Sequence, residues 1–412
     1  MTVTEIDELV KRILRGEVRL HEVEKHVKDS NVATRVRRRA IEEISHLDLS
    51  PLDDNVVDFN DVVGRNCENT IGCVKVPMGI AGPLKVRGDH ASGEYLIPLA
   101  TTEGALVASV NRGASAITES GGAVVKVLDD KITRAPVFKT PSLEKAVEFI
   151  EWVEDNFGKI KEVFESTTRH GRLLRIRPYV VGRTVFLRFE ASSGDAMGMN
   201  MIVKATDEVS RFIHENLPWV ENVSLSGNLC TDKKAAAINW VLGRGKSVIA
   251  EAVVSRETVE KKLKTTPDRI VEVVLRKLYL GSGRAGVLGG FNAHVANVIA
   301  ALFLATGQDL AQVVDSSHCI TYCEELDDGD LYISITLPTL EVGTVGGGTS
   351  LPTQRKALEI IGVAGGGEPP GTNALKFAEI VAATVLAGEL SLLSALAAHH
   401  LADAHMRLGR KK

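Results

Sequence analysis

Apolar positions follow helical spacing in some segments of the chain and strand spacing in others. Residues 1–48 are rich in charge and poor in glycine, and E-I-D-E-L-V-K-R-I-L repeats apolar positions at three- and four-residue intervals. We therefore expect a helical N-terminal subdomain at residues 1–63. From Gly64 onward E-N-T-I-G-C-V-K-V-P-M-G-I-A-G-P-L-K-V predicts strands and tight turns. The run T-T-E-G-A-L-V-A-S-V-N-R-G-A-S-A-I then predicts a helix of small residues that packs closely on a neighbour.

The pattern changes again between about Arg134 and Val223. There V-F-K-T-P-S-L-E-K-A-V-E-F-I-E-W-V predicts an amphipathic helix, and R-L-L-R-I-R-P-Y-V-V-G-R-T-V-F-L-R-F-E-A predicts a hairpin. M-N-M-I-V-K-A-T-D-E-V predicts a further helix. This succession is typical of a small α+β module inserted into a larger domain, so the predicted fold class is α+β. The predicted domains are 1–63, then 64–134 with 236–412, the insert 135–223, and a linking loop at 224–235.

Composition and charge exclude several classes of protein. The chain has 412 residues, 44% hydrophobic and 25% charged, as in an ordinary globular protein. Its net charge of −4 leaves no basic surplus for binding nucleic acid. The two longest apolar stretches do not predict a membrane span, since 296–306 is short and 381–398 contains Gly388 and Glu389. The N-terminus lacks the apolar region of a signal peptide, and we expect a cytoplasmic protein without a membrane partner.

Five cysteines without a C-x-x-C pair disfavour both a disulfide framework and structural zinc, so no metal site is expected.

Two glycine motifs do not predict a nucleotide-binding site. Gly281–Gly286 matches G-x-G-x-x-G, but the next acid, Asp309, follows a helical pattern rather than a second strand. G-R-G-K-S, residues 243–247, lacks the earlier glycine of a phosphate-binding loop, because Trp240 occupies that position.

The stretch S-G-N-L-C-T-D-K-K-A-A-A-I-N-W, residues 226–240, raises an electrostatic question. Thr231 or Asp232 is a suitable N-cap for a helix that continues to Trp240. Lys233 and Lys234 then fall in its first turn, where the helix dipole disfavours cations by roughly 0.3–1 kcal/mol each. Either their ammonium groups extend into water or they await an anion.

Three further side chains are candidates for acid–base chemistry, each with a structural alternative. Glu103 lies between threonines and small apolar residues, so it is either a desolvated carboxyl that donates a proton or a helix cap. Asp309 follows the most apolar helix, so it is either a partner for a cation or a cap. His405 shares an Ala/Leu helix with His399 and His400, so it is either an acid–base group or an ordinary helical residue. D-A-M-G-M-N-M, residues 195–201, is either core filler or an adaptable surface for a cofactor.

These motifs occur together in one order. E-N-T-I-G, T-T-E-G-A-L-V-A-S-V-N-R-G, D-A-M-G-M-N-M, T-D-K-K, G-G-F-N-A-H-V-A-N, G-Q-D-L-A-Q, E-V-G-T-V-G-G-G-T and L-A-D-A-H-M closely resemble the 3-hydroxy-3-methylglutaryl-CoA (HMG-CoA) reductase family. The resemblance runs from about Gly64 to Arg407, and the forms of D-A-M-G-M-N-M and T-D-K-K resemble the NADPH-using class of eukaryotes and archaea. Compared with the animal and fungal enzymes, the chain is expected to lack their membrane domain.

The resemblance implies roles for individual residues. It makes Glu103, Lys233, Asp309 and His405 the catalytic residues. Substrate contacts are implied for the hydroxymethylglutaryl group at Arg134, Ser226, Asp232, Lys234, Lys277 and Asn297, and for coenzyme A between Ser109 and Ser115, including Asn111 and Arg112. Contacts to NADPH are implied at Thr168, Arg169, Asp195, Met197, Gly198, Met199, Asn200, Met201 and Arg410.

The implied reaction is the four-electron reduction of HMG-CoA to mevalonate and coenzyme A. In it Lys233 stabilises the oxyanion, Lys234 and Arg134 neutralise the substrate carboxylate, His405 protonates the leaving thiolate, and Glu103 protonates the alcohol oxygen. Asp309 couples to Lys233 and Glu103. By resemblance the inserted domain is ferredoxin-like and binds the cofactor, and the large domain binds substrate and dimerises, with active sites at the interface of a homodimer or higher assembly.

Two departures from the family pattern are visible. Ala235 stands where many members have proline, and Lys411 stands where the animal enzyme has a phosphorylatable serine, so that control is expected to be absent. Two alternatives remain open from the sequence: an NADH-linked enzyme that oxidises mevalonate, and a coenzyme A-binding protein without reductase activity.

Overall fold

The computed structural model describes residues 3–53 and 56–398. Contacts between Cα atoms divide the chain into two compact units, Met1–Pro77 with Ser350–Gln354, and Met78–Thr349 with Arg355–Lys412. His399, His400, His405, Arg410 and Lys411 lie outside the described residues.

The first unit is helical, as its apolar spacing predicts. Its elements are α1 (Val3–Leu14), η1 (Leu20–Lys25), α2 (Ser30–Ser45), η2 (Ser50–Leu52) and α3 (Phe59–Val62). Asp29 and Asp58 cap α2 and α3 by accepting hydrogen bonds from backbone amides of the first turn. Arg37 is fully buried, pairs with Glu24, and donates to the carbonyl oxygens of Leu20 and Thr70.

The second unit contains a large mixed sheet. Its strands are β1 (Met78–Arg87), β2 (Ser92–Ala100), β3 (Ala123–Arg134), β8 (Gly245–Val254), β9 (Gly290–Phe291), β10 (Cys319–Glu325) and β11 (Leu331–Leu340). They lie in the order β2-β1-β3-β8-β11-β10-β9, with β1–β3 and β10–β9 parallel and the other neighbours antiparallel. Every second residue is buried and apolar from Val248 to Val254 in β8 and from Leu331 to Leu337 in β11, as expected for strands with one buried face.

Helices and short turns connect and cover this sheet. They are α4 (Leu106–Glu119), α8 (Ala237–Leu242), α9 (Arg256–Thr258), η3 (Val259–Leu263), α10 (Pro267–Val273), η4 (Val274–Gly281), α11 (Ser282–Ala285), α12 (Val295–Thr306), η5 (Leu310–Gln312), α13 (Val313–Ser316), η6 (Gly347–Ser350), α14 (Pro352–Ile361) and α15 (Thr372–Ala397). The G-x-G-x-x-G run therefore ends a π-helix and enters α11, whereas a dinucleotide fingerprint would follow a strand.

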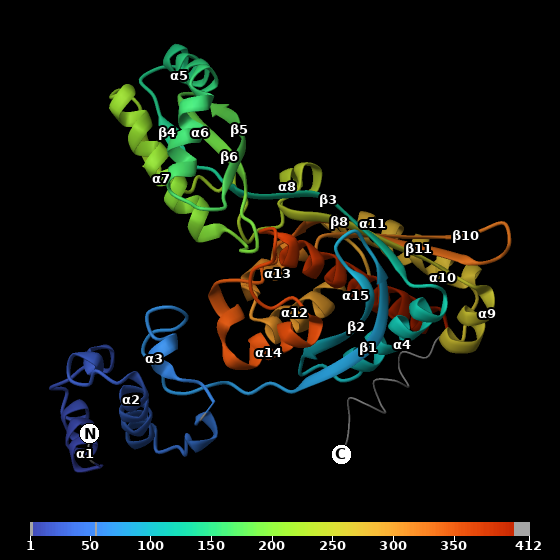
Figure 1. Ribbon diagram of the computed structural model, residues 1–412, viewed down its shortest axis with the longest axis horizontal. Helices are drawn as coiled ribbons and strands as arrows, with labels where there is room; N and C mark the ends of the chain where they lie inside the picture. The colour runs from blue at the N-terminus through green and yellow to red at the C-terminus, as the bar shows by residue number, and fades with distance from the viewer. Residues whose placement is uncertain (1–2, 54–55, 399–412) are drawn as a thin grey trace. The chain divides into compact units, whose positions relative to one another are not determined.

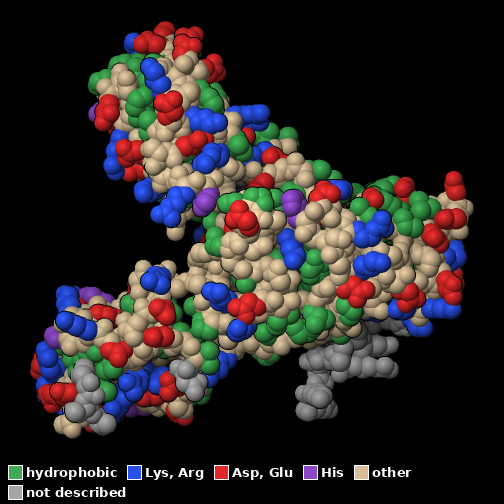
Figure 2. All heavy atoms as spheres, in the orientation of Figure 1, with side chains coloured by type: hydrophobic (Ala, Val, Ile, Leu, Met, Phe, Trp, Pro, Cys, Tyr) green, Lys and Arg blue, Asp and Glu red, His purple; other side chains and the backbone are tan. Residues whose placement is uncertain are grey.

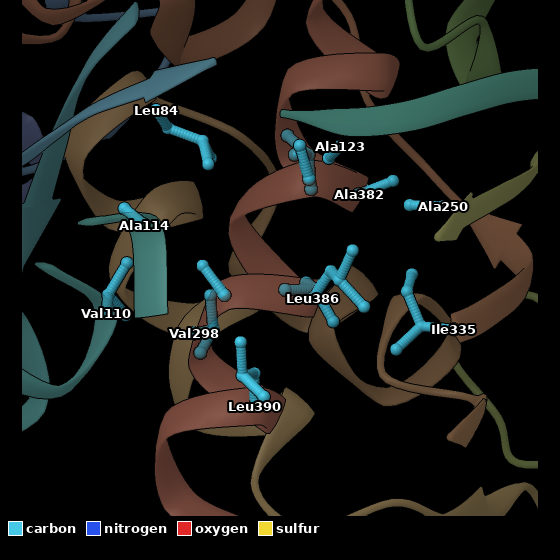
Figure 3. Packing of buried hydrophobic residues seen from close by; sticks show 14 of the residues in the cluster. Leu84, Val110, Ala114, Ala123, Ala250, Val298, Ile335, Ala382, Leu386 and Leu390 are labelled. Atoms are coloured by element: carbon cyan, nitrogen blue, oxygen red, sulfur yellow. The ribbon is translucent and has the colours of Figure 1, made fainter. Parts of the chain in front are cut away.

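Helix α15 forms the centre of the core. Figure 3 shows Ala382, Leu386 and Leu390 of this helix among residues of α4, α12, β3, β8 and β11. A side chain at Gly113 of α4 would collide with the backbone at Ala387, so the predicted small-residue helix does pack backbone to backbone. This contact determines the position of α4 and therefore of the segment 101–105 that precedes it.

Helix α15 continues through Gly388 and Glu389, the two residues that interrupt the apolar stretch 381–398 in the sequence. Glu389 is fully buried, and its carboxylate accepts hydrogen bonds from the amides of Ala293 and His294 and from the Thr321 hydroxyl. These donors satisfy the charge inside the core. By length and composition α15 is apolar enough to cross a membrane, and 89% of its apolar window is buried inside the protein.

The inserted module has its own sheet and core. It comprises β4 (Val137–Lys139), α5 (Leu143–Asp155), α6 (Phe157–Ser166), β5 (Arg172–Val181), β6 (Thr184–Ser192), α7 (Met199–Asn216) and β7 (Glu221–Ser224). The strands lie in the antiparallel order β7-β4-β6-β5, and Figure 1 shows the helices beside them. This is the β-α-β-β-α-β arrangement of ferredoxin-like folds. The predicted α+β class and ferredoxin-like insert are confirmed.

Strand β3 belongs to both sheets, since residues 132–134 pair with β6 after the earlier residues pair with β8.

The surface of the described residues carries both signs of charge, and Figure 2 shows lysine and arginine interspersed with aspartate and glutamate.

Candidate active site

The turn that carries Lys233 and Lys234 precedes a helix but does not begin one. Helix α8 starts at Ala237 with Ala236 as its N-cap, so the expectation that both lysines occupy its first turn is wrong. Thr231 and Lys233 instead adopt left-handed backbone conformations, with φ of 58° and 59°. The two expected cap side chains have other partners: the Thr231 hydroxyl contacts Asn239, and the Asp232 carboxylate accepts from Arg244 and Gln312.

Lys233 forms an ion pair with Asp309, with Nζ and Oδ2 2.8 Å apart. Asp309 also caps η5, because its carboxylate accepts from the Ala311 amide at 3.1 Å. Both interpretations of Asp309 are therefore realised in the same side chain. The hydrogen bond that Lys233 donates to Asp309 raises the pKa of the Lys233 ammonium, so the group stays charged. Lys234 is exposed and donates to the carbonyl oxygen of Asp232 at 3.1 Å.

Glu103 is exposed, so the expectation of a desolvated carboxyl is wrong for this single chain. It is not a helix cap either, because α4 begins at Leu106 after Ala105. The Asn297 side-chain amide donates to Glu103 Oε2 at 2.7 Å. Glu103 follows β2 and precedes α4, in an irregular segment where few atoms cover its side chain.

Other residues of the implied substrate site surround the loop 224–235 or lie apart from it. Arg134, at the end of β3, donates from Nε to the carbonyl oxygen of Leu225 at 2.9 Å. The Ser226 hydroxyl lies 3.7 Å from the Cys230 sulfur. Lys277 is exposed on η4, and its side chain makes no hydrogen bond or ion pair with any residue in the described ranges.

The implied coenzyme A contacts lie on α4. Ser109 Oγ and Arg112 Nε each lie 3.0 Å from the Ser391 hydroxyl of α15, and Arg112 also donates to the Ser391 carbonyl at 2.6 Å. Burial lowers the pKa of the Arg112 guanidinium. Asn111 is exposed, and its Oδ1 accepts from the Gly82 amide at 3.0 Å. In the single chain, Ser109 and Arg112 are therefore used to join two helices.

Asp195 occupies the start of the methionine-rich segment, but its carboxylate faces the protein interior. Oδ2 accepts from the amides of Gly367 and Gly371 at 2.9 and 2.7 Å, and Oδ1 accepts from Ala374 at 3.0 Å. These amides belong to the first turn of α15 and the loop before it, so Asp195 ties the segment to that helix.

The rest of the segment leads into α7. Gly198 precedes the helix with φ of 103°, a conformation that side chains rarely adopt, and Met199, Asn200 and Met201 form the first turn. Met197, Met199 and Met201 pack against the core of the inserted module, which supports the core interpretation. Asn200 is exposed at the same helix end, so it is accessible to a ligand. Thr168 accepts from the Gly171 amide at 3.0 Å, and the Arg169 side chain is exposed.

Comparison with known proteins assigns the chain to a family. A family model described as hydroxymethylglutaryl-coenzyme A reductase matches residues 33–410. The chain belongs to this family.

Relatives named 3-hydroxy-3-methylglutaryl-coenzyme A reductase include proteins of archaea. The one from Pyrococcus abyssi is 56% identical over 98% of this chain and 100% of its own length. That from Haloferax volcanii is 51% identical over 99% of this chain and 100% of its own length. A Streptococcus pneumoniae class II reductase, solved with NADPH in open conformations, superimposes with a TM-score of 0.66 at 16% identity, covering 90% of this chain and 88% of that one.

Sequence reasoning missed the buried groups beneath the lysine turn of this HMG-CoA reductase family member. Arg244, fully buried, donates from Nη2 to Asp232 Oδ1 and from Nη1 to Asp315 Oδ2, both at 2.8 Å, and it also pairs with Glu341. Arg244 lies in the rejected G-R-G-K-S run, between Gly243 and Gly245 with φ of 72° and 68°. Two glycines that flank an arginine before an apolar strand were a usable signal for a constrained, buried cation.

The acids around Arg244 predict a pH dependence of stability. Burial raises the pKa of Glu341 from 4.5 to about 8 and that of Asp315 from 3.8 to about 6. The folded protein therefore holds a proton on Glu341 that the unfolded chain has released between pH 4.5 and about 8, so stability should fall as pH rises through this window. We expect Glu341→Gln to flatten this slope, with a relative change in Tm of roughly 2 °C or more by calorimetry. Parallel Tm–pH curves for the two proteins would contradict it.

Proposed function

We propose that this protein reduces HMG-CoA to mevalonate and coenzyme A with two molecules of NADPH. Besides family membership, one observation carries the proposal: an ammonium, Lys233, is held by Asp309 at 2.8 Å on a turn that presents Lys234 beside it. A thioester takes up two hydrides and two protons to become a primary alcohol and a free thiol. When bound, NADPH supplies the two hydrides.

Lys233 has the properties that oxyanion stabilisation requires. The first reduction step places negative charge on the thioester oxygen, and a fixed cationic donor beside it lowers the barrier by several kcal/mol when water is excluded. Asp309 keeps the ammonium protonated and fixes its direction. Lys234 lies on loop 224–235, and Arg134 contacts the same loop through its Nε donor to Leu225, so we assign these two cations to the distal carboxylate of the substrate.

Two protons are assigned to acids of the chain. We assign the proton for the departing thiolate to His405, which lies outside the described residues, and the proton for the alcohol oxygen to Glu103. The contact with Asn297 orients the Glu103 carboxyl at 2.7 Å. Because Glu103 is exposed in the single chain, bound substrate or a second subunit must cover it before it acts as a general acid.

The spacing along α12 supports assembly from two subunits. Asn297, the partner of Glu103, lies in the first turn of α12, and Asp309, the partner of Lys233, follows its last turn. The nine helical steps from Asn297 to Thr306 span about 14 Å. We propose that a homodimer or higher assembly completes the site by bringing the two pairs to one substrate, and that the enzyme works in the cytoplasm.

The residues around α7 fit an anionic dinucleotide. The helix has 18 residues and no side-chain cap at its N-terminus, so the amide groups there are available to a phosphate. A side chain at Gly198 would collide with Ser193, so the backbone approaches closely at this point. Arg169 is exposed in the same module and suits a further phosphate group.

The test of the function is a coupled product assay. We expect NADPH oxidation that depends on HMG-CoA, with two NADPH consumed for each mevalonate and each free thiol formed. Faster initial rates with NADH, or preferred oxidation of mevalonate, would favour the catabolic direction. Coenzyme A binding without turnover would exclude the reductase.

Lys234→Ala should act chiefly on substrate binding. Removal of one of two cations near the substrate carboxylate is expected to raise KM for HMG-CoA roughly tenfold, since a charge-assisted hydrogen bond contributes about 1.5–3 kcal/mol. We expect kcat to change much less, as steady-state kinetics would measure. A normal KM would contradict the assignment.

A further inference from the structure

The turn 231–234 holds an unfavourable backbone conformation. Thr231 and Lys233 have positive φ values of 58° and 59°, and neither is glycine or asparagine. Such conformations cost about 1–3 kcal/mol each and persist only where the surroundings impose them. The direction of the Lys233 side chain therefore depends on groups beneath the turn.

One guanidinium connects to the turn by two routes. Arg244 Nη2 donates to Asp232 Oδ1 at 2.8 Å, and Gln312 Nε2 donates to the same oxygen at 2.8 Å. Arg244 Nη1 donates to Asp315 Oδ2 at 2.8 Å, and this oxygen also accepts from the backbone amide of Lys233 at 3.2 Å. Adjacent residues 232 and 233 are thus both held through Arg244.

The backbone and Nε of Arg244 are fixed as well. Its amide donates to the Pro338 carbonyl at 3.2 Å, and Nε donates to the Thr133 hydroxyl at 3.1 Å. A side chain at Gly245 would collide with the carbonyl of Leu340, so the strand end lies directly against β11. Arg244 Nη1 also donates to Gln312 of η5 and Nη2 to Met199 Sδ of α7, both at 3.2 Å, so the side chain is held on several sides.

We propose that Arg244 is a positioning residue for the reduction: through its buried contacts with Asp232, Asp315 and Glu341 it imposes the turn from which Lys233 meets Asp309. This inference rests on the proposed function for its effect on turnover, but the geometry of the turn can be tested without catalysis.

Charge determines when the contacts hold. Three carboxylates contact Arg244. The other groups that face them are Lys233, Lys246, which pairs with Asp130 at 3.1 Å, Cys230 and the buried Arg188. Burial raises the pKa of Glu341 to about 8, so at neutral pH this carboxyl is protonated: it still accepts a hydrogen bond from Arg244 but does not compete as a negative charge with Asp232 and Asp315. Above pH 8 an ionised Glu341 competes for Arg244.

The experiment compares Arg244→Lys with Arg37→Lys. Arg37 is also fully buried but belongs to the first unit, whereas the lysine turn belongs to the second. Lysine keeps the charge but cannot donate in the fork that reaches Asp232 and Asp315 together. We expect R244K to lower kcat about 100-fold with KM for NADPH changed less than threefold, and R37K to retain activity. Wild-type kcat in folded R244K would overturn the proposal.

A labelling measurement reports on the turn independently of turnover. With an amine-directed reagent and mass spectrometry, we expect Lys233 in R244K to react at least fivefold faster than in wild type, relative to Lys145, which pairs with Glu148 on the inserted module. Equal relative labelling would overturn the proposal even if the wild-type protein lacks reductase activity.

A second variant tests the proposal if R244K does not fold. Glu341→Gln preserves the neutral form of the side chain, so it should lose less activity than wild type between pH 8 and 9.5, and its Lys233 labelling relative to that of Lys145 should not increase over that range. If Arg244 and Glu341 had only a structural role, the ratio of the activity of Glu341→Gln to that of wild type would not change with pH. An activity ratio and a labelling ratio that are constant with pH would overturn the proposal.

Discussion

Replacement of Lys233 by alanine should reduce HMG-CoA-dependent NADPH oxidation by at least about 10³-fold, while the protein remains folded. The loss of one preorganised donor to an oxyanion costs about 10²–10³-fold in other enzymes, and here the donor also carries the positive charge. The side chain is 40% exposed and pairs with a carboxylate that is 35% exposed, so its removal should affect stability little.

The matched control is Lys264→Ala. Lys264 is another exposed lysine with positive φ, 62°, at the end of a short helical segment, so the change repeats the backbone and charge effects away from the turn. Circular dichroism and NADPH binding should be unchanged in both variants. Turnover of the Lys233 variant within tenfold of wild type would refute its role at the oxyanion.

Asp195→Ala should weaken both stability and NADPH binding. Three backbone amides lose their buried carboxylate acceptor, and charge-assisted hydrogen bonds contribute about 1.5–3 kcal/mol each, so we expect a loss of roughly 3 kcal/mol or more. Release of the segment 195–201 should also raise the Kd for NADPH at least tenfold. Chemical denaturation and cofactor fluorescence measure the two effects.

Glu379→Ala separates the two effects, because it removes a similar buried carboxylate. Glu379 accepts from the amides of Asp89, His90 and Ala91 at 3.1, 2.9 and 2.6 Å. Its loss should lower stability by a comparable amount but leave the Kd for NADPH within about threefold once measured on folded protein. Equal Kd values for the Asp195 variant and wild type would remove segment 195–201 from the cofactor site.

Periodic segments were predictable from sequence because local spacing determines them. The β5–β6 hairpin and α7 occur where expected, whereas the stretch predicted as a helix from Val137 begins as strand β4 and becomes α5 only at Leu143. The small residues of α4 correctly predicted close packing, since Gly113 leaves space for the α15 backbone.

The prediction failed where distant partners compete with local rules. Asp232 was a suitable N-cap by type, but a buried arginine twelve positions later takes its carboxylate, and the helix begins later. The sequence also offered no partner for Glu389, whose carboxylate accepts hydrogen bonds from the amides of residues 293 and 294. Neither partner can be inferred from the neighbouring sequence, because tertiary structure creates both contacts. The roles of the site residues stay predictions.

The carboxylates around α15 have a consequence for the order of folding. Glu379 holds residues 89–91, and Glu389 holds residues 293–294, at separations of nearly 300 and about 100 positions. Contacts of such long range form late, because loop closure must precede them. The core of the inserted module draws on residues 132–220 alone. During synthesis the inserted module should therefore fold first, whereas the large domain can fold only after its central helix α15 has left the ribosome.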